Sequence, residues 1–155
     1  MRIQRLLSLV LPLTLAACLS GTTDPVLATV ETTTFAPALG VDLATSTKTA
    51  SGLYYRDITV GTGTTLARGQ RVGVYYDGYF SDGTRFDHLL ASDATPAPAP
   101  FSFTLGSGQV IFGFDEGVTG MKIGGMRQII IPPALAYGYQ RNDVLIFNVE
   151  AISAQ

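Results

Sequence analysis

The sequence of 155 residues contains no tryptophan, one cysteine, Cys18, and one histidine, His88. A single cysteine excludes a disulfide within the chain, so packing alone has to hold the core together. Neither residue has the neighbouring ligands that a metal site requires. The segment 61–63, Gly-Thr-Gly, is too short for a dinucleotide-binding loop. We therefore expect neither a metal nor any other cofactor.

Positive charge is also scarce. Ten Lys and Arg residues stand against twelve Asp and Glu residues, which gives a net charge of −2. A dedicated nucleic-acid-binding protein usually has a basic excess, so we expect no nucleic-acid partner. Charged residues make up only 14% of the sequence and hydrophobic residues 46%, a balance that excludes a highly charged, disordered chain. The length favours one domain with one core.

No apolar run is long enough to cross a membrane stably. The longest one, residues 6–17, is too short and contains Pro12. It follows a short segment with two positive charges, Arg2 and Arg5. This order is typical of a signal for export, so we predict that residues 1–17 are a signal peptide.

The predicted signal ends in Leu-Ala-Ala-Cys at residues 15–18. This tetrapeptide resembles a bacterial lipobox, in which the thiol of Cys18 is acylated and the chain is cleaved before it. More than one acyl chain gives lasting membrane attachment. The alternative is an ordinary signal peptide with an incidental cysteine. We expect a lipid-anchored protein of the bacterial cell envelope. Since Leu19 rather than Asp follows Cys18, its expected place is the outer membrane, facing the periplasm, in a cell that has one.

The segment that follows is poor in aromatic residues. Residues 19–50 contain nine threonines, four charged residues and one aromatic residue, Phe35. We predict that residues 18–50 are a lipidated cysteine followed by a flexible spacer. Docking on the domain remains the alternative for six of its apolar residues, which are Val26, Leu27, Val30, Leu39, Val41 and Leu43.

Residues 51–155 have the pattern of a folded domain. Alternation over residues 70–80 places Val72, Val74 and Tyr76 on one face of a strand. An Asp-Gly turn at residues 82–83 predicts a hairpin. Other strands are expected at 53–60, 84–86, 101–105, 126–131 and 144–152, the last with Leu145, Phe147 and Val149 facing inward.

One segment predicts a helix. In residues 113–121, Phe114, Val118 and Met121 have helical spacing, and two acidic residues in the first turn suit the helix dipole. The expected fold class is α+β: an antiparallel sheet of about five strands curled around one short helix.

Three segments in a fixed order resemble FKBP-type peptidyl-prolyl cis-trans isomerases. They are residues 52–63 (GLYYRDITVGTG), 74–87 (VYYDGYFSDGTRFD) and 109–138 (QVIFGFDEGVTGMKIGGMRQIIIPPALAYG). With the lipobox, the chain resembles a bacterial lipoprotein form of this family. The resemblance implies a single FKBP-like domain over residues 51–155, a monomer, and partners that are unfolded or flexible polypeptides containing X-Pro bonds.

The family binds a prolyl peptide in an apolar pocket between the helix and the sheet. The resemblance implies catalytic roles for Asp87, Tyr137 and Phe114. It also implies a set of substrate-binding residues, which are Tyr76, Phe86, Phe101, Val110, Ile111 and Phe147. Rotation about a peptide bond breaks its resonance, so an apolar pocket that favours the less polar, twisted amide is sufficient, without a nucleophile or a metal.

The sequence departs from the family in three places near this pocket. His88-Leu89-Leu90 stands where a basic residue often follows Phe-Asp. Phe114 stands where the family most often has tryptophan. The loop after Tyr137 is about seven residues shorter than in compact members of the family, and Tyr139 is the residue we expect to replace part of it. These departures leave a second hypothesis, a non-catalytic, chaperone-like lipoprotein that binds peptides in the same pocket. A purely structural envelope lipoprotein is the third.

Overall fold

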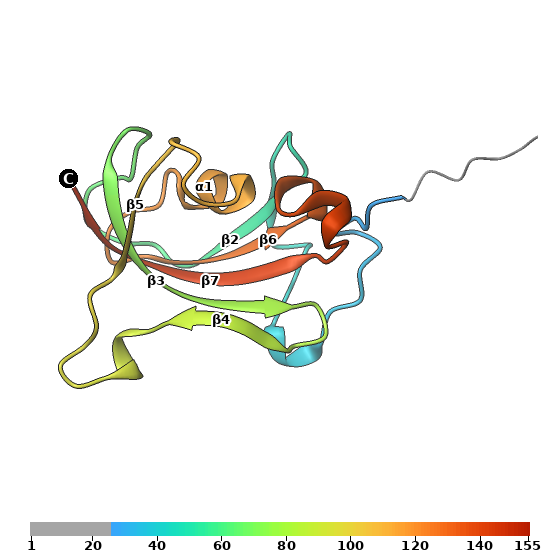
Figure 1. Ribbon diagram of the computed structural model, residues 1–155, viewed down its shortest axis with the longest axis horizontal. Coiled ribbons are helices and arrows are strands. Elements are labelled where there is room, and N and C mark those ends of the chain that lie inside the picture. The colour runs from blue at the N-terminus through green and yellow to red at the C-terminus, as the bar shows by residue number, and fades with distance from the viewer. Residues whose placement is uncertain (1–25) are drawn as a thin grey trace, which may run out of the picture.

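The computed structural model describes residues 26–155, which form one antiparallel sheet, one short α-helix and four 3-10 turns (Figure 1). The strands are β1 (Thr47–Lys48), β2 (Tyr54–Thr59), β3 (Arg71–Phe80), β4 (Arg85–Leu89), β5 (Phe101–Thr104), β6 (Met126–Ile131) and β7 (Leu145–Ala154). The helix is α1 (Phe112–Val118), and the 3-10 turns are η1 (Pro37–Leu39), η2 (Ala91–Asp93), η3 (Pro133–Leu135) and η4 (Gly138–Gln140).

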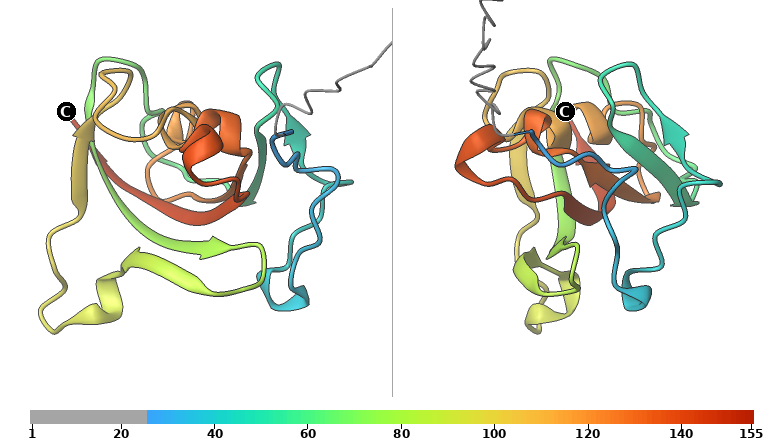
Figure 2. Two further views of the ribbon diagram at one scale, coloured as in Figure 1. Left: turned by 45° about the vertical axis from the view of Figure 1, so that its right-hand side comes forward. Right: turned by 90° about the vertical axis from the view of Figure 1, so that its right-hand side faces the viewer.

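The long strands β3 and β7 form the centre of the sheet. Its order is β1-β2-β6-β7-β3-β4, with β5 paired to the other end of β3. The sheet curves, and α1 lies inside the curve (Figure 2). The α+β prediction is confirmed, with seven strands instead of about five. The one strand that the sequence did not predict is the short β1.

The inner face of the sheet, the one that α1 covers, carries the main core. Alternate residues of each strand point to this side, as the period of a strand requires. The residues expected to face inward on β7, which are Leu145, Phe147 and Val149, all lie in this core, as do Val72 and Val74 of β3. The alternation of these two strands was therefore sufficient to predict their inner face.

The helix approaches β6 very closely, because two of its positions are glycine. A Cβ atom at Gly113 would lie 2.3 Å from the Cγ2 atom of Ile131, and one at Gly117 would lie 2.5 Å from the Cγ2 atom of Ile129. The helix is shorter than the predicted 113–121. It ends at Val118, where the guanidinium of Arg127 donates to the Gly117 carbonyl oxygen at 3.0 Å.

The outer face of the sheet is covered by residues 26–46, which we call the N-terminal strap. Val30 and Leu39 of the strap are buried against side chains of the outer face. These are Tyr54 of β2, Ile130 of β6, Val144 just before β7, and Ile146 of β7. The amide of Gln128 also donates to the Leu39 carbonyl oxygen at 2.8 Å. The strap runs along the sheet on the side opposite to α1 (Figure 2).

The prediction of a flexible spacer is therefore wrong for residues 26–50. The physical reason is that the outer face of β6 and β7 is apolar. Without the strap, Ile130 and Ile146, both fully buried, would be exposed to water, and covering them is favourable. The predicted signal peptide, Cys18 and Leu19 lie outside the described residues.

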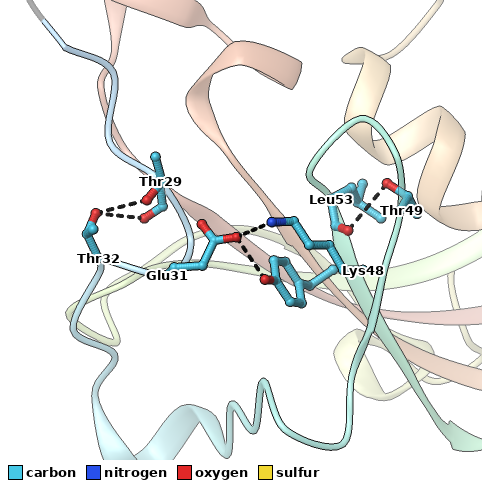
Figure 3. A network of polar contacts seen from close by, with 7 residues as sticks. Thr29, Glu31, Thr32, Lys48, Thr49 and Leu53 are labelled. Carbon is cyan, nitrogen blue, oxygen red and sulfur yellow. Dashed lines mark hydrogen bonds and ion pairs between the residues drawn. The ribbon is translucent and has the colours of Figure 1, made fainter.

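A polar cluster fixes the beginning of the strap to the sheet (Figure 3). Glu31 forms an ion pair with Lys48 of β1, and it accepts a hydrogen bond of 2.8 Å from the hydroxyl of Tyr54. These hydrogen bonds, first that of Lys48, lower the pKa of Glu31 from 4.5 to about 2. Thr29 and Thr32, on the turn that carries Glu31, bond to each other at 3.0 Å. The strap is thus held by polar as well as apolar contacts.

Candidate active site

A cavity of about 180 Å³ opens between α1 and the inner face of the sheet. Its lining consists of the nine residues that the sequence assigned to the pocket, namely Tyr76, Phe86, Asp87, Phe101, Val110, Ile111, Phe114, Tyr137 and Phe147. They come from β3, β4, β5, β7, the helix, the loop before the helix and the loop that joins η3 to β7. The structure brings together every one of these residues; their roles in catalysis or binding stay predictions.

Aromatic rings form the inner part of the cavity. Phe114 of α1 and Phe147 of β7 are buried, and their ring centroids lie 5.1 Å apart at an angle of 76°. Phe86 meets Phe147 edge to face at 5.5 Å, with an angle of 89°. Such arrangements place the positive edge of one ring against the negative face of another. The inner walls of the cavity are therefore apolar.

Helix α1 positions Phe114 at the bottom of this cavity. Ile111 immediately before the helix is extended (φ −58°, ψ 145°), and Phe114 follows within the first turn. The carboxylate of Asp115 accepts hydrogen bonds from the Gly106 amide at 2.7 and 2.9 Å, which fixes the loop between β5 and α1. The phenyl ring at 114 lacks the N–H group that an indole ring would bring to the site.

Tyr76 and Asp87 form the polar side of the cavity. The Tyr76 hydroxyl donates to the Oδ2 atom of Asp87 at 2.8 Å, and the Oδ1 atom of Asp87 accepts from the His88 amide at 2.9 Å. Burial, together with the bond to Asp87, raises the pKa of Tyr76 to about 12. The phenol therefore stays protonated at neutral pH and orients the carboxylate of the exposed Asp87.

The rim of the cavity is open to solvent. Phe101 is 37% exposed and Tyr137 is 46% exposed. Within residues 26–155, neither the Ile111 amide nor the Tyr137 hydroxyl forms a hydrogen bond. Both are donors that a bound polypeptide carbonyl can engage. Tyr139, which we expected to replace part of the shortened loop, is 67% exposed and does not line the cavity.

Two residues that shape the cavity were not predicted from the sequence. A Cβ atom at Gly78 would lie 2.9 Å from the Cε1 atom of Phe147 and 3.0 Å from the Cζ atom of Phe86. Glycine at this position of β3 therefore makes room for both rings. Phe80 supports Phe86 from behind, with ring centroids 4.8 Å apart. Glycine within a strand is a sign of such close approach, so Gly78 had a usable signal.

Other kinds of site have little support in this part of the chain. No group of three His, Cys, Asp or Glu side chains among residues 26–155 is arranged to hold a metal ion. The same residues include no helix of the length and apolarity needed to cross a membrane.

Comparison with known proteins identifies the family. Residues 63–152 match the model of the FKBP-type peptidyl-prolyl cis-trans isomerases. FK506-binding protein 4 of Rhizopus delemar is 41% identical over 114 residues, which are 69% of this chain and 28% of that protein. A peptidyl-prolyl cis-trans isomerase of Saccharomyces cerevisiae is 42% identical over 108 residues, which are 66% of this chain and 25% of that protein. The chain thus spans less than a third of these relatives.

Two solved structures have the same fold. FkpA from Escherichia coli is 32% identical, with a TM-score of 0.63 over 72% of this chain and 52% of that one. AtFKBP13 is 30% identical, with a TM-score of 0.61 over 71% of this chain and 98% of that one. On the family match, these relatives and the lined cavity, the chain belongs to the FKBP-type peptidyl-prolyl cis-trans isomerases.

Proposed function

We propose that this protein is a peptidyl-prolyl cis-trans isomerase that acts on unfolded or flexible polypeptides. One observation carries the proposal: nine side chains from four strands, the helix and two loops line a single apolar cavity, and two donors at its rim form no hydrogen bond with residues 26–155. The family name and the names of the relatives support the same activity.

The cavity has the properties that this reaction needs. The planar amide resists rotation by about 18–20 kcal/mol. At the twisted transition state the nitrogen is no longer conjugated, and the amide is less polar. The rings of Phe86, Phe114 and Phe147 grip the proline and exclude water, which favours the twisted form over the planar one. The Ile111 amide and the Tyr137 hydroxyl hold substrate carbonyl groups, and Asp87 lies beside the rotating carbonyl.

We further propose that the protein is exported and lipid-anchored through Cys18 to the bacterial cell envelope, where its substrates are exported proteins. The support is the sequence of residues 1–18: two positive charges, a short apolar run and the lipobox-like Leu-Ala-Ala-Cys. Labelling of cells with a radioactive fatty acid tests this part. Acylation of the wild type and its loss in Cys18→Ser is the expected result; an unlabelled wild type contradicts it.

The second candidate is a chaperone-like protein that binds peptides in the same cavity without catalysis. The observation in its favour is the open rim, where Tyr139 does not line the cavity and Tyr137 is half exposed. Such a protein would suppress aggregation of a client without accelerating its isomerisation.

One experiment separates the two candidates. The cis-trans exchange of an X-Pro peptide is followed by exchange NMR with the full chain in mild detergent. An isomerase accelerates the exchange, and Phe114→Leu, which keeps an apolar side chain, slows it strongly. If peptide resonances shift on binding while the exchange rate stays at its uncatalysed value, the protein is a binder and the proposal of an isomerase fails.

A further inference from the structure

The loop between η3 and β7 carries Tyr137, and very little of the sheet holds it. Its internal hydrogen bonds are local: the Gln140 amide donates to the Tyr137 carbonyl at 3.2 Å, and the Arg141 amide donates to the Gly138 carbonyl at 3.3 Å. Farther along, the Arg141 guanidinium lies 5.1 Å from the centroid of the Phe80 ring. A short loop with local bonds needs an additional attachment to keep one conformation.

Asn142 supplies that attachment, and its partner is the N-terminal strap. Its Oδ1 atom accepts a hydrogen bond of 2.6 Å from the Ala28 amide, and its Nδ2 atom donates one of 3.2 Å to the Val26 carbonyl oxygen. The amide group of Asn142 thereby pairs with the backbone of two strap residues as a neighbouring strand would. Residues more than 110 positions apart are joined in this way.

The strap is a firm support at this point. Two residues beyond Ala28, the side chain of Val30 is almost completely buried. The next residue, Glu31, binds both Lys48 and Tyr54 of the sheet (Figure 3). The other end of the loop is also fixed, because Val144 is buried in the same apolar cluster as Val30. Asn142 therefore ties the loop to a segment that is itself immobilised.

We propose that Asn142 is a positioning residue of the active site: through the strap, it holds the loop that places Tyr137 at the rim of the cavity. This inference rests on the proposed isomerase activity. It also gives the strap a role in the site, although the strap lies on the face of the sheet opposite to the cavity. In this chain the strap takes over the fixing of a loop that is too short to fold back on itself.

Two substitutions remove the same contact from opposite sides. Asn142→Ala removes both bonds from the loop. Ala28→Pro removes the N–H group that donates to Asn142, and it leaves the loop sequence intact. We expect each to lower kcat/KM for an X-Pro peptide roughly fivefold, the order expected for one or two hydrogen bonds. The loss should appear mainly in KM, because Tyr137 holds the substrate. The midpoint of thermal unfolding should change little.

Three control variants distinguish loss of the contact between Asn142 and the strap from a general disturbance of the loop. Gln140→Ala changes an exposed side chain of the same loop that forms no hydrogen bond with residues 26–155, and it should leave kcat/KM unchanged. Asn142→Asp keeps the acceptor for Ala28 and should recover part of the activity. In the double variant Ala28→Pro/Asn142→Ala, the loss should be no larger than in the single variants, since both act on one contact.

Several outcomes overturn the inference. An active wild type with an equally active Asn142→Ala variant contradicts it and leaves the proposed isomerase function standing. The inference is also contradicted if the loss of kcat/KM in the double variant equals the product of the losses in the two single variants. An inactive wild type contradicts the proposed function instead. In that case amide hydrogen exchange of residues 138–143 decides: exchange at least roughly fivefold faster in both single variants supports the inference, and unchanged exchange overturns it.

Discussion

The two faces of the sheet are buried by different means. The inner face is covered by α1 and by aromatic rings that leave a cavity open to solvent. The outer face is covered by the strap, an irregular segment with few bulky side chains, which leaves Ile130 and Ile146 with no exposed surface. The cavity of the proposed activity thus lies on the inner face, whereas the outer layer contributes stability and, at its Ala28 end, holds the loop that carries Tyr137. Substitutions on the two faces should therefore have separable effects.

The largest effect is expected on the inner face. Phe114→Ala removes a buried ring that contacts Tyr76, Phe103 and Phe147. Loss of such a ring destabilises a protein by about 3–5 kcal/mol, and the isomerase activity should fall at least roughly tenfold, since the bottom of the cavity is lost. Urea unfolding and peptide exchange rates measure the two quantities. Full activity in folded Phe114→Ala would contradict the role of this ring.

The matching change on the outer face should affect stability alone. Leu39→Ala opens a gap between the strap and the sheet, and we expect a loss of about 2–3 kcal/mol in the free energy of unfolding. Activity per folded molecule should stay at the wild-type value, since Leu39 lies at the far end of the strap from Asn142. A lowered kcat/KM at a temperature where the variant is fully folded would break the distinction between the two faces.

A smaller effect is expected for the hydroxyl of Tyr76. Tyr76→Phe removes the hydrogen bond to Asp87, which contributes about 1 kcal/mol, so we expect a severalfold loss of kcat/KM because Asp87 is no longer oriented.

The raised pKa of Tyr76 predicts a dependence of stability on pH. The stabilisation is complete below pH 10 and is lost as the pH rises toward about 12. Unfolding midpoints measured across this range should fall less steeply in Tyr76→Phe.

The smallest effect concerns the polar attachment of the strap. The pKa of Glu31 is lowered to about 2, so its contribution to stability is present above pH 4.5 and is lost as the pH falls toward 2. Glu31→Gln should therefore be slightly less stable than the wild type at pH 7 and nearly equal to it at pH 2. Urea unfolding at both pH values measures this difference. An equal difference at both pH values would show that the carboxylate charge is not what matters.

The sequence was informative where a pattern had one physical explanation. Alternation in β3 and the inward set of β7 are explained by one buried face, and both predictions were correct. The nine residues of the cavity came from the family resemblance; taken singly, each phenylalanine was more typical of an ordinary core residue. Cys18 and the signal peptide stay predictions, since they lie outside the described residues.

Docking of the strap was only the alternative prediction, because its signal lay elsewhere in the chain. Its own residues are rich in threonine, with apolar residues far apart. The informative segments were Ile129–Ile131 and Leu145–Phe147, runs of consecutive apolar residues on adjacent strands. Such runs indicate strands buried on both faces, so something had to cover the outer one. Which segment covers it depends on tertiary contacts such as that of Gln128 with Leu39, which no local pattern predicts.

Gly113 and Gly117 of the helix limit how substitutions could change the size of the cavity. With Gly113 and Gly117 in contact with two isoleucines of β6, α1 has no room to move closer to the sheet, and any larger side chain at either position would lift it away. The depth of the cavity is thus set by the close approach of the helix backbone to β6. To bind a larger or smaller side chain, the cavity would have to change through substitution of individual aromatic residues, because the helix cannot move closer to β6.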